Sequence, residues 1–541
     1  MKRKISFRSF PGQLTLSGLF LLALLFVQCR RAEPQTVSRD TTITPRVAVT
    51  RLLVDSSGME KYMAAHLLDD SLANRLRNFY NSRNYQFAWV SEHGLTEQAK
   101  VFYDLDNSYI TASKDSAPAD QQLHRQLAEL ISKDTTIRGT SPALIDLELS
   151  LTQHFFNFVT TAYGGKLDPA ALQWYIPRKK IDAAALLDSL VAKKGHGLED
   201  WEPVNHYYKA LHKELARWNT IAQKPWEPLN THQAYTAGAG GKSAAALRRR
   251  LIDFGSLAPQ DTAGVLDGTT TEAVRTVQKQ LGLPATGRVN RTLIDALNVP
   301  ATVRIQQMLI NLERTRWTPQ LPEGKWILVN IPEYRLHVFE GGNEVMNMGI
   351  VVGKAANKTV IFSKELKNIV FSPYWNIPES IVKTEVLPAI RANRNYLAQK
   401  HMEQYGVSQG VPLIRQLPGN SNSLGRVKFL FPNTYNIYLH DTPAKSLFAE
   451  QVRAFSHGCI RLAEPKKLAE YLLEDQPGWT SARIDQAMNS EKEVWVTVKQ
   501  HIPVYITYFT SWVDKNSLIN FRDDIYAHDQ EMAKQMFPAE E

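Results

Sequence analysis

The chain has 541 residues, of which 43% are hydrophobic and 22% are charged, and it carries a formal net charge of +9. These are ordinary values for a soluble globular protein, and the length predicts about three or four domains. The positive charges are scattered rather than grouped, which argues against a nucleic-acid-binding protein and fits a mild attraction to a carboxylate-rich polymer.

Residues 1–29 have the pattern of an export signal. A basic start, MKRK, precedes an apolar run over residues 14–27 that is too short to cross a bilayer easily. Cys29 follows directly, as in lipoprotein signals, where this cysteine becomes the acylated N-terminus. Gln28 stands where such signals usually carry a small residue, so a plain signal remains the alternative. We expect a periplasmic protein anchored to a membrane through Cys29, with residues 30–67 as a polar tether.

Residues 68–225 are predicted to form one mostly helical domain. Apolar residues recur there at helical spacing, for example in SLANRLRNFY and QQLHRQLAEL, and no motif in the segment carries chemistry. Residues 224–243 have the composition of a linker. They end in GAGGKS, which is similar to a phosphate-binding loop, but the full pattern requires Gly where the chain has Thr236. A flexible linker is therefore the better interpretation.

Residues 244–298 are predicted to form a compact unit of short helices separated by glycine turns. The order of its parts, GVLDGTTTEAVRTVQKQ followed by GLPATGRVNRT, resembles the small three-helix peptidoglycan-binding domain. A generic helical spacer is the alternative. The resemblance implies that peptidoglycan is a partner of this part of the chain.

From residue 325 the hydrophobic pattern changes from helical to alternating. The run WILVNIPEYRLHVFEGGNEVMNMGIVVG predicts strands around a Gly-Gly turn, and further strands follow. Two stretches of helical pattern, SIVKTEVLPAIRA and NYLAQKHMEQYG, interrupt the strands, and an insertion of this size is often functional. We therefore predict a β-rich domain over 325–530 with an inserted helical lid at about 379–420. The fold class of the chain is multi-domain α+β.

Two segments of the β-rich domain carry residues that suit one chemistry. YNIYLHDTP ends a predicted strand in His440 and Asp441, and SHGCIRL contains Cys459. Only a small fraction of a free thiol is ionised near neutral pH, and a nearby imidazole can accept its proton. Gly458 permits a tight turn whose backbone N–H groups can face a developing oxyanion. In an exported protein, a cysteine without an intramolecular partner is a candidate reactive thiol.

These segments resemble the catalytic domain of the L,D-transpeptidases, also called the YkuD domain. The resemblance rests on HDTP followed by SHGCIR, with 19 residues from His440 to Cys459. The layout of the whole chain resembles the large periplasmic, multi-domain branch of that family. The resemblance implies that Cys459 is the nucleophile, that His440 is the general base, and that the backbone carbonyl of Asp441 orients the base. It also implies that no metal or organic cofactor is needed.

The resemblance assigns the other positions of the signature loop as well. Ser456, His457 and Gly458 complete the loop. His457 stands two residues from the cysteine and cannot easily present its ring to that thiol from one tight turn. We therefore expect His457 to support the oxyanion loop, while His440 acts as the base.

Three residues are candidates for contact with substrate. Arg461 stands where the family often has Asn, a departure shared by the multi-domain branch, and it is placed to attract a substrate carboxylate or to steady the loop. Tyr438 and Trp375 are candidates at the cleft. Packing in the core is an equal alternative for both aromatic residues.

The resemblance implies a peptidoglycan L,D-transpeptidase that forms 3→3 cross-links through a thioester on Cys459. An L,D-carboxypeptidase has the same site, as does a transferase that joins wall peptide to a protein or to D-amino acids, and both remain alternatives. A wall-binding scaffold protein is the non-enzymatic alternative. At the level of residues, His440, His457 and Cys459 could instead bind zinc, or the cysteine could be an inert core residue.

Overall fold

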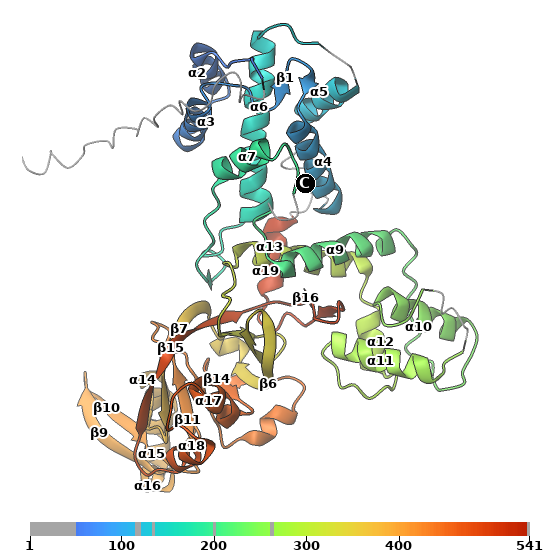
Figure 1. Cartoon of the computed structure of the whole chain (residues 1–541). Coiled ribbons are helices and arrows are strands. Elements are labelled where there is room, and N and C mark those ends of the chain that lie inside the picture. The colour runs from blue at the N-terminus through green and yellow to red at the C-terminus, as the bar shows by residue number, and fades with distance from the viewer. Residues whose placement is uncertain (1–49, 114–120, 133–135, 198–201, 260–264, 538–541) are drawn as a thin grey trace, which may run out of the picture. The chain divides into compact units, whose positions relative to one another are not determined.

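The computed structural model describes residues 50–113, 121–132, 136–197, 202–259 and 265–537 (Figure 1). The expected export signal and Cys29 lie outside these residues. Within the described part, no helix has the length and apolar character needed to cross a membrane. The chain divides into two compact units, one with residues up to 101 and 121–154, the other with residues 102–120 and 155 onwards.

The first unit is mainly helical. Its elements are α2 (Ser56–Ala65), α3 (Asp70–Ser82), the short pair β1 (Val90–Ser91) and β2 (Gly94–Leu95), the start of α4 (Glu97–Ser113), α5 (Gln121–Ser132) and most of α6 (Pro142–Phe158). Glu148 of α6 is fully buried, and its carboxylate accepts the backbone N–H groups of Ala88 (2.5 Å) and Trp89 (3.1 Å). This carboxylate joins α6 to the segment before β1.

The boundary of the predicted tether is corrected by helix α2. Residues 30–67 were expected to be a polar tether, but the part from residue 50 onwards is folded. Asp55 caps α2, and Met59, Tyr62 and Met63 are buried. Their spacing is that of one helix face, so the apolar pattern was present in the sequence within a segment that is otherwise polar.

Most helices in the helical part of the second unit pack around one hydrophobic core. The helices of this part are η1 (Val159–Tyr163), α7 (Ala183–Ala192), α9 (His206–Ala222), α10 (Lys242–Asp253), α11 (Gly268–Gln280), α12 (Arg291–Leu297), α13 (Ala301–Trp317) and the C-terminal α19 (His528–Met536). Helices α9 to α13 pack around this core together with the hairpin of β16 (Ser511–Val513) and β17 (Ile519–Phe521). The three helices expected over 244–298 are α10, α11 and α12.

A ten-stranded sheet forms the β-rich part of the second unit. Its strands are β3 (Trp174–Tyr175), β4 (Trp326–Asn330), β5 (Arg335–Glu340), β6 (Asn343–Gly353), β7 (Ile361–Phe371), β11 (Val427–Leu430), β12 (Leu439–His440), β13 (Ala454–Ser456), β14 (Ile460–Leu462) and β15 (Val494–Thr507). The order is β11-β12-β14-β6-β5-β4-β15-β7-β3, and β11 also pairs with β7, which closes eight of the strands into a ring. Helices α17 (Pro465–Leu473) and α18 (Ser481–Met488) contribute to its core.

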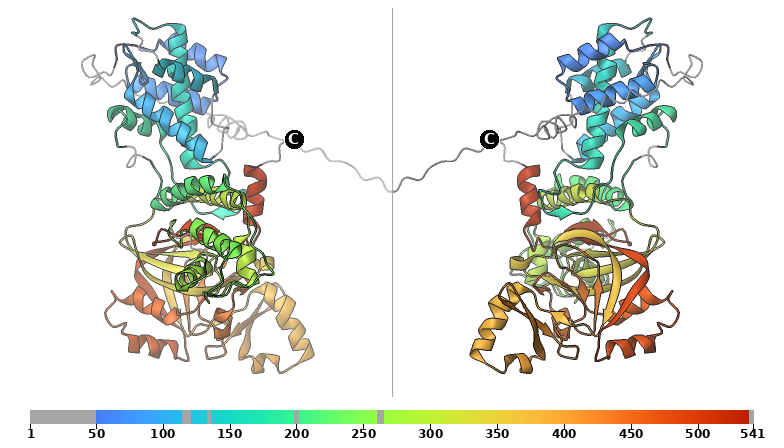
Figure 2. Two further views of the ribbon diagram at one scale, coloured as in Figure 1. Left: turned by 90° about the vertical axis from the view of Figure 1, so that its right-hand side faces the viewer. Right: turned by 90° about the vertical axis from the view of Figure 1, so that its left-hand side faces the viewer.

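The lid is only half helical, which corrects the prediction of a helical insertion. Its helical half contains α14 (Glu379–Ile381), η3 (Val382–Val386), α15 (Leu387–Ala392) and α16 (Tyr396–Gln399). The rest is a small sheet of β8 (Trp375–Asn376), β10 (Val411–Gln416) and β9 (Met402–Ser408). The lid, drawn in yellow to orange, extends away from the main sheet (Figure 2).

The hairpin between β9 and β10 explains this difference. Ser408 pairs with Val411, so the loop has two residues, and both have positive φ angles, 47° at Gln409 and 79° at Gly410. Two left-handed residues in a two-residue loop are typical of a tight β-hairpin. The mixed helical and β architecture predicted from the sequence is confirmed.

Candidate active site

The loop that carries Cys459 is a tight turn between β13 and β14. Gly458 has a φ of 116°, a conformation that L side chains rarely adopt. The Ser456 hydroxyl accepts the N–H of Gly458 (3.1 Å) and donates to the carbonyl of Cys459 (2.6 Å). Thr359 donates its hydroxyl to the carbonyl of Gly458 (2.8 Å). The turn is therefore held from inside by Ser456 and from the neighbouring segment by Thr359.

His440 is held by the residue that follows it. The ring is buried at the end of β12, and its Nδ1–H donates to the carbonyl of Asp441 (2.5 Å). The carboxylate of Asp441 accepts the N–H of Arg426 (2.8 Å) and pairs with Lys445 (2.6 Å). A Cβ atom on Gly425 would lie 2.4 Å from the carboxyl carbon of Asp441, so this glycine leaves room for the carboxylate.

The strand pairing places His440 and Cys459 in diagonal positions. Strands β12 and β14 are parallel, with His440 opposite Arg461, and the N–H of Ile460 donates to the carbonyl of Tyr438 (3.1 Å). Side chains alternate along strands, so Tyr438, His440, Cys459 and Arg461 share one face of the pair. Diagonal neighbours in sheets lie about 7–8 Å apart, with their Cβ atoms somewhat closer.

The thiol of Cys459 contacts the loop before β12. Its S–H donates to the carbonyl of Asn436 (3.5 Å), and the sulfur accepts hydrogen bonds from the backbone and the hydroxyl of Tyr438. Among the hydrogen bonds of the described residues, none joins this sulfur to the ring of His440. In this arrangement the S–H proton is directed at Asn436 rather than at the imidazole.

Both groups are neutral at neutral pH. Burial raises the pKa of the Cys459 thiol, while the hydrogen bonds from Tyr438 and the charge of Arg461 act against this rise. Burial and, to a smaller extent, the charge of Arg461 lower the pKa of His440 to about 4, against the opposing effect of the hydrogen bond to the Asp441 carbonyl. The resting pair is thus a thiol and a neutral imidazole, which is a base able to accept a proton.

Arg461 links the two groups electrostatically. Its side chain is half-buried, and burial lowers its pKa while the neighbouring Cys459 raises it. Its Nε–H is buried and has no hydrogen-bond acceptor among the residues that the structure describes. This donor and its charge are available to an acidic group beside the thiol.

The other two sequence candidates lie between the turn and the lid. His457 is exposed and points its Nε2 at the carboxylate of Glu385 in η3 of the lid (3.1 Å). Trp375 of β8 is hydrogen-bonded to the hydroxyl of Tyr438, which also contacts the thiol. The structure therefore brings Cys459, Tyr438 and Trp375 together and directs His457 to the lid.

Several residues of the site were not found from the sequence. Thr359, Asn436 and Glu385 touch the turn, the thiol and the loop histidine, respectively. Tyr526, near the C-terminus, donates its hydroxyl to the carbonyl of Gly353, whose strand borders the turn. No local pattern marks these residues, because each acts through a contact between segments far apart in the chain.

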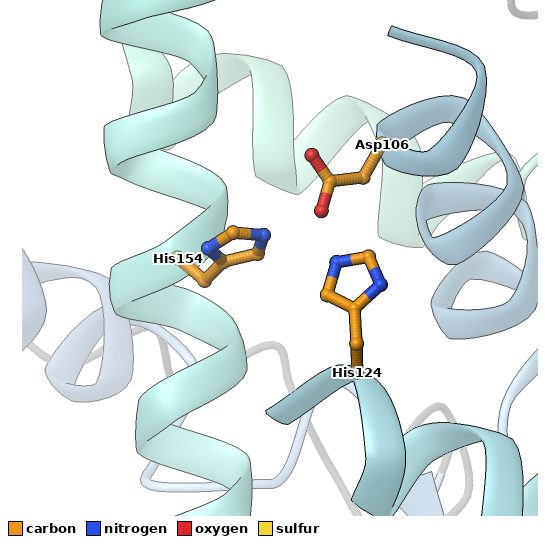
Figure 3. Close-up of side chains that lie close together, drawn as sticks. All are labelled: Asp106, His124 and His154. Atoms are coloured by element: carbon orange, nitrogen blue, oxygen red, sulfur yellow. The ribbon is translucent and has the colours of Figure 1, made fainter. Parts of the chain in front are cut away.

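A separate group of side chains has the composition of a metal site. Asp106 of α4, His124 of α5 and His154 of α6 place one ligand atom each within 4.8 Å of one another (Figure 3). It is the one such group found in the described part of the chain, and His440, His457 and Cys459 are not among its members. The zinc interpretation of the cysteine site therefore gains no support from the geometry.

Comparison with protein families matches three parts of the chain. Residues 324–498 match the L,D-transpeptidase catalytic domain called YkuD, residues 74–215 match a scaffold domain, and residues 240–297 match the family described as "Putative peptidoglycan binding domain". This chain carries a YkuD-family L,D-transpeptidase catalytic domain. The resemblances to the L,D-transpeptidase catalytic domain and to the peptidoglycan-binding domain are confirmed.

A curated protein and several solved structures are also similar to parts of this chain. A curated Haemophilus influenzae protein named "Putative L,D-transpeptidase" is 30% identical over 239 residues, which are 41% of this chain and 48% of the relative. The chain thus matches about half of that relative's length. An L,D-transpeptidase structure from Mycobacterium smegmatis has a TM-score of 0.20 at 14% identity, over 35% of this chain and 60% of that chain. One from Xylanimonas cellulosilytica has a TM-score of 0.17 at 15% identity, over 52% of this chain and all of that chain.

Proposed function

We propose that the chain is a peptidoglycan L,D-transpeptidase that forms 3→3 cross-links through a thioester on Cys459. The observation that carries the proposal is the shared strand face of Cys459, His440, Tyr438 and Arg461, which lies inside the matched catalytic domain. A nucleophile, a neutral base and a cation occupy one face, and cysteine acyl transfer uses a thiol activated by a neighbouring base.

The first half-reaction forms the thioester. His440 takes the proton of Cys459 as the sulfur attacks the carbonyl of the third residue of a donor stem peptide. The charge of Arg461 favours the thiolate, because it stabilises the anion without donating a proton. The C–N bond to the terminal D-alanine then breaks, and His440 returns the proton to the departing amine.

The second half-reaction uses the same base. The side-chain amine of an acceptor stem attacks the thioester, His440 takes a proton from that amine, and the thiol is released. Water in place of the amine would give a trimmed stem peptide, which is the L,D-carboxypeptidase outcome. The lid favours the amine by excluding water from the thioester.

Product analysis tests the proposal. We expect the purified chain to convert disaccharide-tetrapeptides into 3→3 dimers that mass spectrometry identifies, and Cys459→Ser to make none. Free tripeptide products without dimers would assign a carboxypeptidase. Products joined to added D-amino acids or to a protein acceptor would assign the corresponding transferase. Dimers from Cys459→Ser at the parental rate would refute the site assignment.

We also propose that the protein is exported to the periplasm and anchored as a lipoprotein through Cys29. The basic start, the short apolar run and the cysteine support this location. Metabolic labelling with a radioactive fatty acid tests the anchor, and the label should be absent from Cys29→Ser. The peptidoglycan-binding domain would then raise the local concentration of substrate around the catalytic domain.

A further inference from the structure

Two exposed tyrosines stack on each other near the thiol. The rings of Tyr175 and Tyr435 have centroids 5.6 Å apart and planes inclined by 23°. Tyr175 is 43% exposed and Tyr435 is 37% exposed. The two residues are 260 positions apart in the chain, so the pair exists only because β3 joins the main sheet.

The loop that carries Tyr435 is rigid. The side chain of Asn433 accepts the N–H groups of Tyr435 (3.0 Å) and Ile437 (3.2 Å) and donates to the carbonyls of Phe431 (2.7 Å) and Ile437 (2.8 Å). Phe362 packs against the Tyr435 ring, with centroids 5.0 Å apart. An aromatic ring supported in this way loses little conformational entropy when a ligand covers it.

The strand that carries Tyr175 is anchored by its neighbour. Tyr175 pairs with Phe362 of β7, and Trp174 pairs with Ile361. Trp174 is buried and packs edge-on against Trp317 of α13, with centroids 5.6 Å apart. Alternation along the strand then directs Tyr175 outwards. Both rings are therefore held in place, and both remain exposed.

The pair lies at the right distance from the thiol to meet the carbohydrate of a donor strand. The carbonyl of Asn436, next to Tyr435, lies 3.5 Å from the sulfur of Cys459. Successive Cα atoms are about 3.8 Å apart, so the Cα atom of Tyr435 lies within about 10 Å of the sulfur. Three extended residues of a stem peptide span about 10 Å, which is the separation between the attacked carbonyl and the sugar that carries the stem.

We propose that Tyr175 and Tyr435 form a platform that binds a pyranose ring of the donor glycan. This inference rests on the proposed function. Aromatic faces carry partial negative charge, and the axial C–H groups of a sugar carry partial positive charge, so a sugar face stacks on a flat aromatic surface. The platform binds the carbohydrate, while the strand face around Cys459 binds the peptide.

The test compares two ligands on one protein. Full-length protein with Cys459→Ala binds a ligand without consuming it, and calorimetry gives its Kd for a disaccharide-tetrapeptide and for the free tetrapeptide. Removing one ring, by Tyr175→Thr or Tyr435→Ala, should weaken binding of the sugar-bearing ligand roughly three- to tenfold. Binding of the free tetrapeptide should stay within about twofold of the parent.

Control variants distinguish the loss of an aromatic ring from damage to the local fold. Thr favours strands and keeps β3 paired. Tyr175→Phe and Tyr435→Phe keep both rings and should bind like the parent. Trp495→Ala removes an aromatic side chain outside the pair that is more exposed, at 57%, and this variant should change neither Kd. Phe variants that lose affinity as the ring-deletion variants do would overturn stacking as the cause.

Three further results would overturn the platform. They are equal weakening of both ligands, no weakening of either, and a parent that binds the two ligands equally well. The dimer assay with Cys459 intact keeps the proposed function separate. Sugar-selective binding without dimers would refute the transpeptidase function and support the platform. Dimers without sugar selectivity would support the transpeptidase function and refute the platform.

Discussion

Replacing Arg461 by Gln should move the acid limb of activity to higher pH. In the parent, burial together with the Arg461 charge lowers the pKa of His440 to about 4. The base is therefore ready over the whole range above that value, and kcat/KM should fall only below about pH 4. Without the guanidinium, the imidazolium loses a repulsive neighbour, so its pKa rises and the limb moves upwards.

The strand register sets the size of this shift. His440 and Arg461 are direct partners across β12 and β14, and paired strands lie about 4.8 Å apart. Two charges at about 5 Å interact by roughly 3 kcal/mol at an effective dielectric constant of about 20. Arg461 is half-exposed, so water screens part of this interaction, and we expect a shift of about one pH unit.

The assay is the pH profile of kcat/KM for dimer formation, measured from about pH 3 to about pH 9. Arg461→Lys retains the charge and should keep the limb within about half a unit of the parent. A second readout is the pH dependence of the rate at which iodoacetamide alkylates Cys459. In Arg461→Gln the rate should rise only at higher pH than in the parent, because the thiolate loses its neighbouring cation. A parental limb near pH 6.5, or a limb that Arg461→Gln leaves unmoved, would refute the electrostatic reasoning.

Three other predictions test the support of the site and of the first unit. Gly425→Ala puts a methyl group into the Asp441 carboxylate at a φ of 63°, so it should destabilise the protein by about 2 kcal/mol or more and lower kcat. Gly410→Ala is the control: it has open space around it and should cost only about 1 kcal/mol of unfolding free energy, as measured by urea titration. Burial raises the pKa of Glu148 to about 7, so the stability of the first unit should be full below about pH 4.5 and fall as pH rises through 7. Glu148→Gln should flatten this dependence in thermal melts at a series of pH values, and an unchanged slope would contradict the role of Glu148. Glu385→Ala removes the exposed contact between the lid and the loop histidine, so the unfolding free energy should change by less than about 0.5 kcal/mol, while the ratio of hydrolysis to dimer formation should rise. A ratio equal to the parent's would show that this contact does not hold the lid.

Most of the fold could be predicted from hydrophobic period. Alternation after residue 325 gave the sheet, and the helical period before it gave the helices. The errors came where a local pattern was ambiguous. The β9 segment has enough apolar residues for either structure, and the Gln409–Gly410 turn together with pairing to β10 decides in favour of a strand. Helix α2 was missed because its three buried residues stand in a polar segment.

For the candidate site, too, the sequence predicts some features and not others. The chemical groups of Cys459 and His440 and the glycine of the turn are properties of two short segments, so the sequence was enough to propose them. The resting contact of the thiol with Asn436 could not be predicted, because it depends on how a loop folds over the sulfur.

The sequence by itself determined which groups can react, because a thiol, an imidazole and a positive-φ turn belong to particular residues at particular spacings. Tertiary structure alone decided how they are tuned and what surrounds them. The low pKa of His440 arises from burial and from Arg461 on the neighbouring strand, and the tyrosine pair arises from a strand that joins the sheet from far along the chain. Burial and charge act through space, so no linear pattern records them.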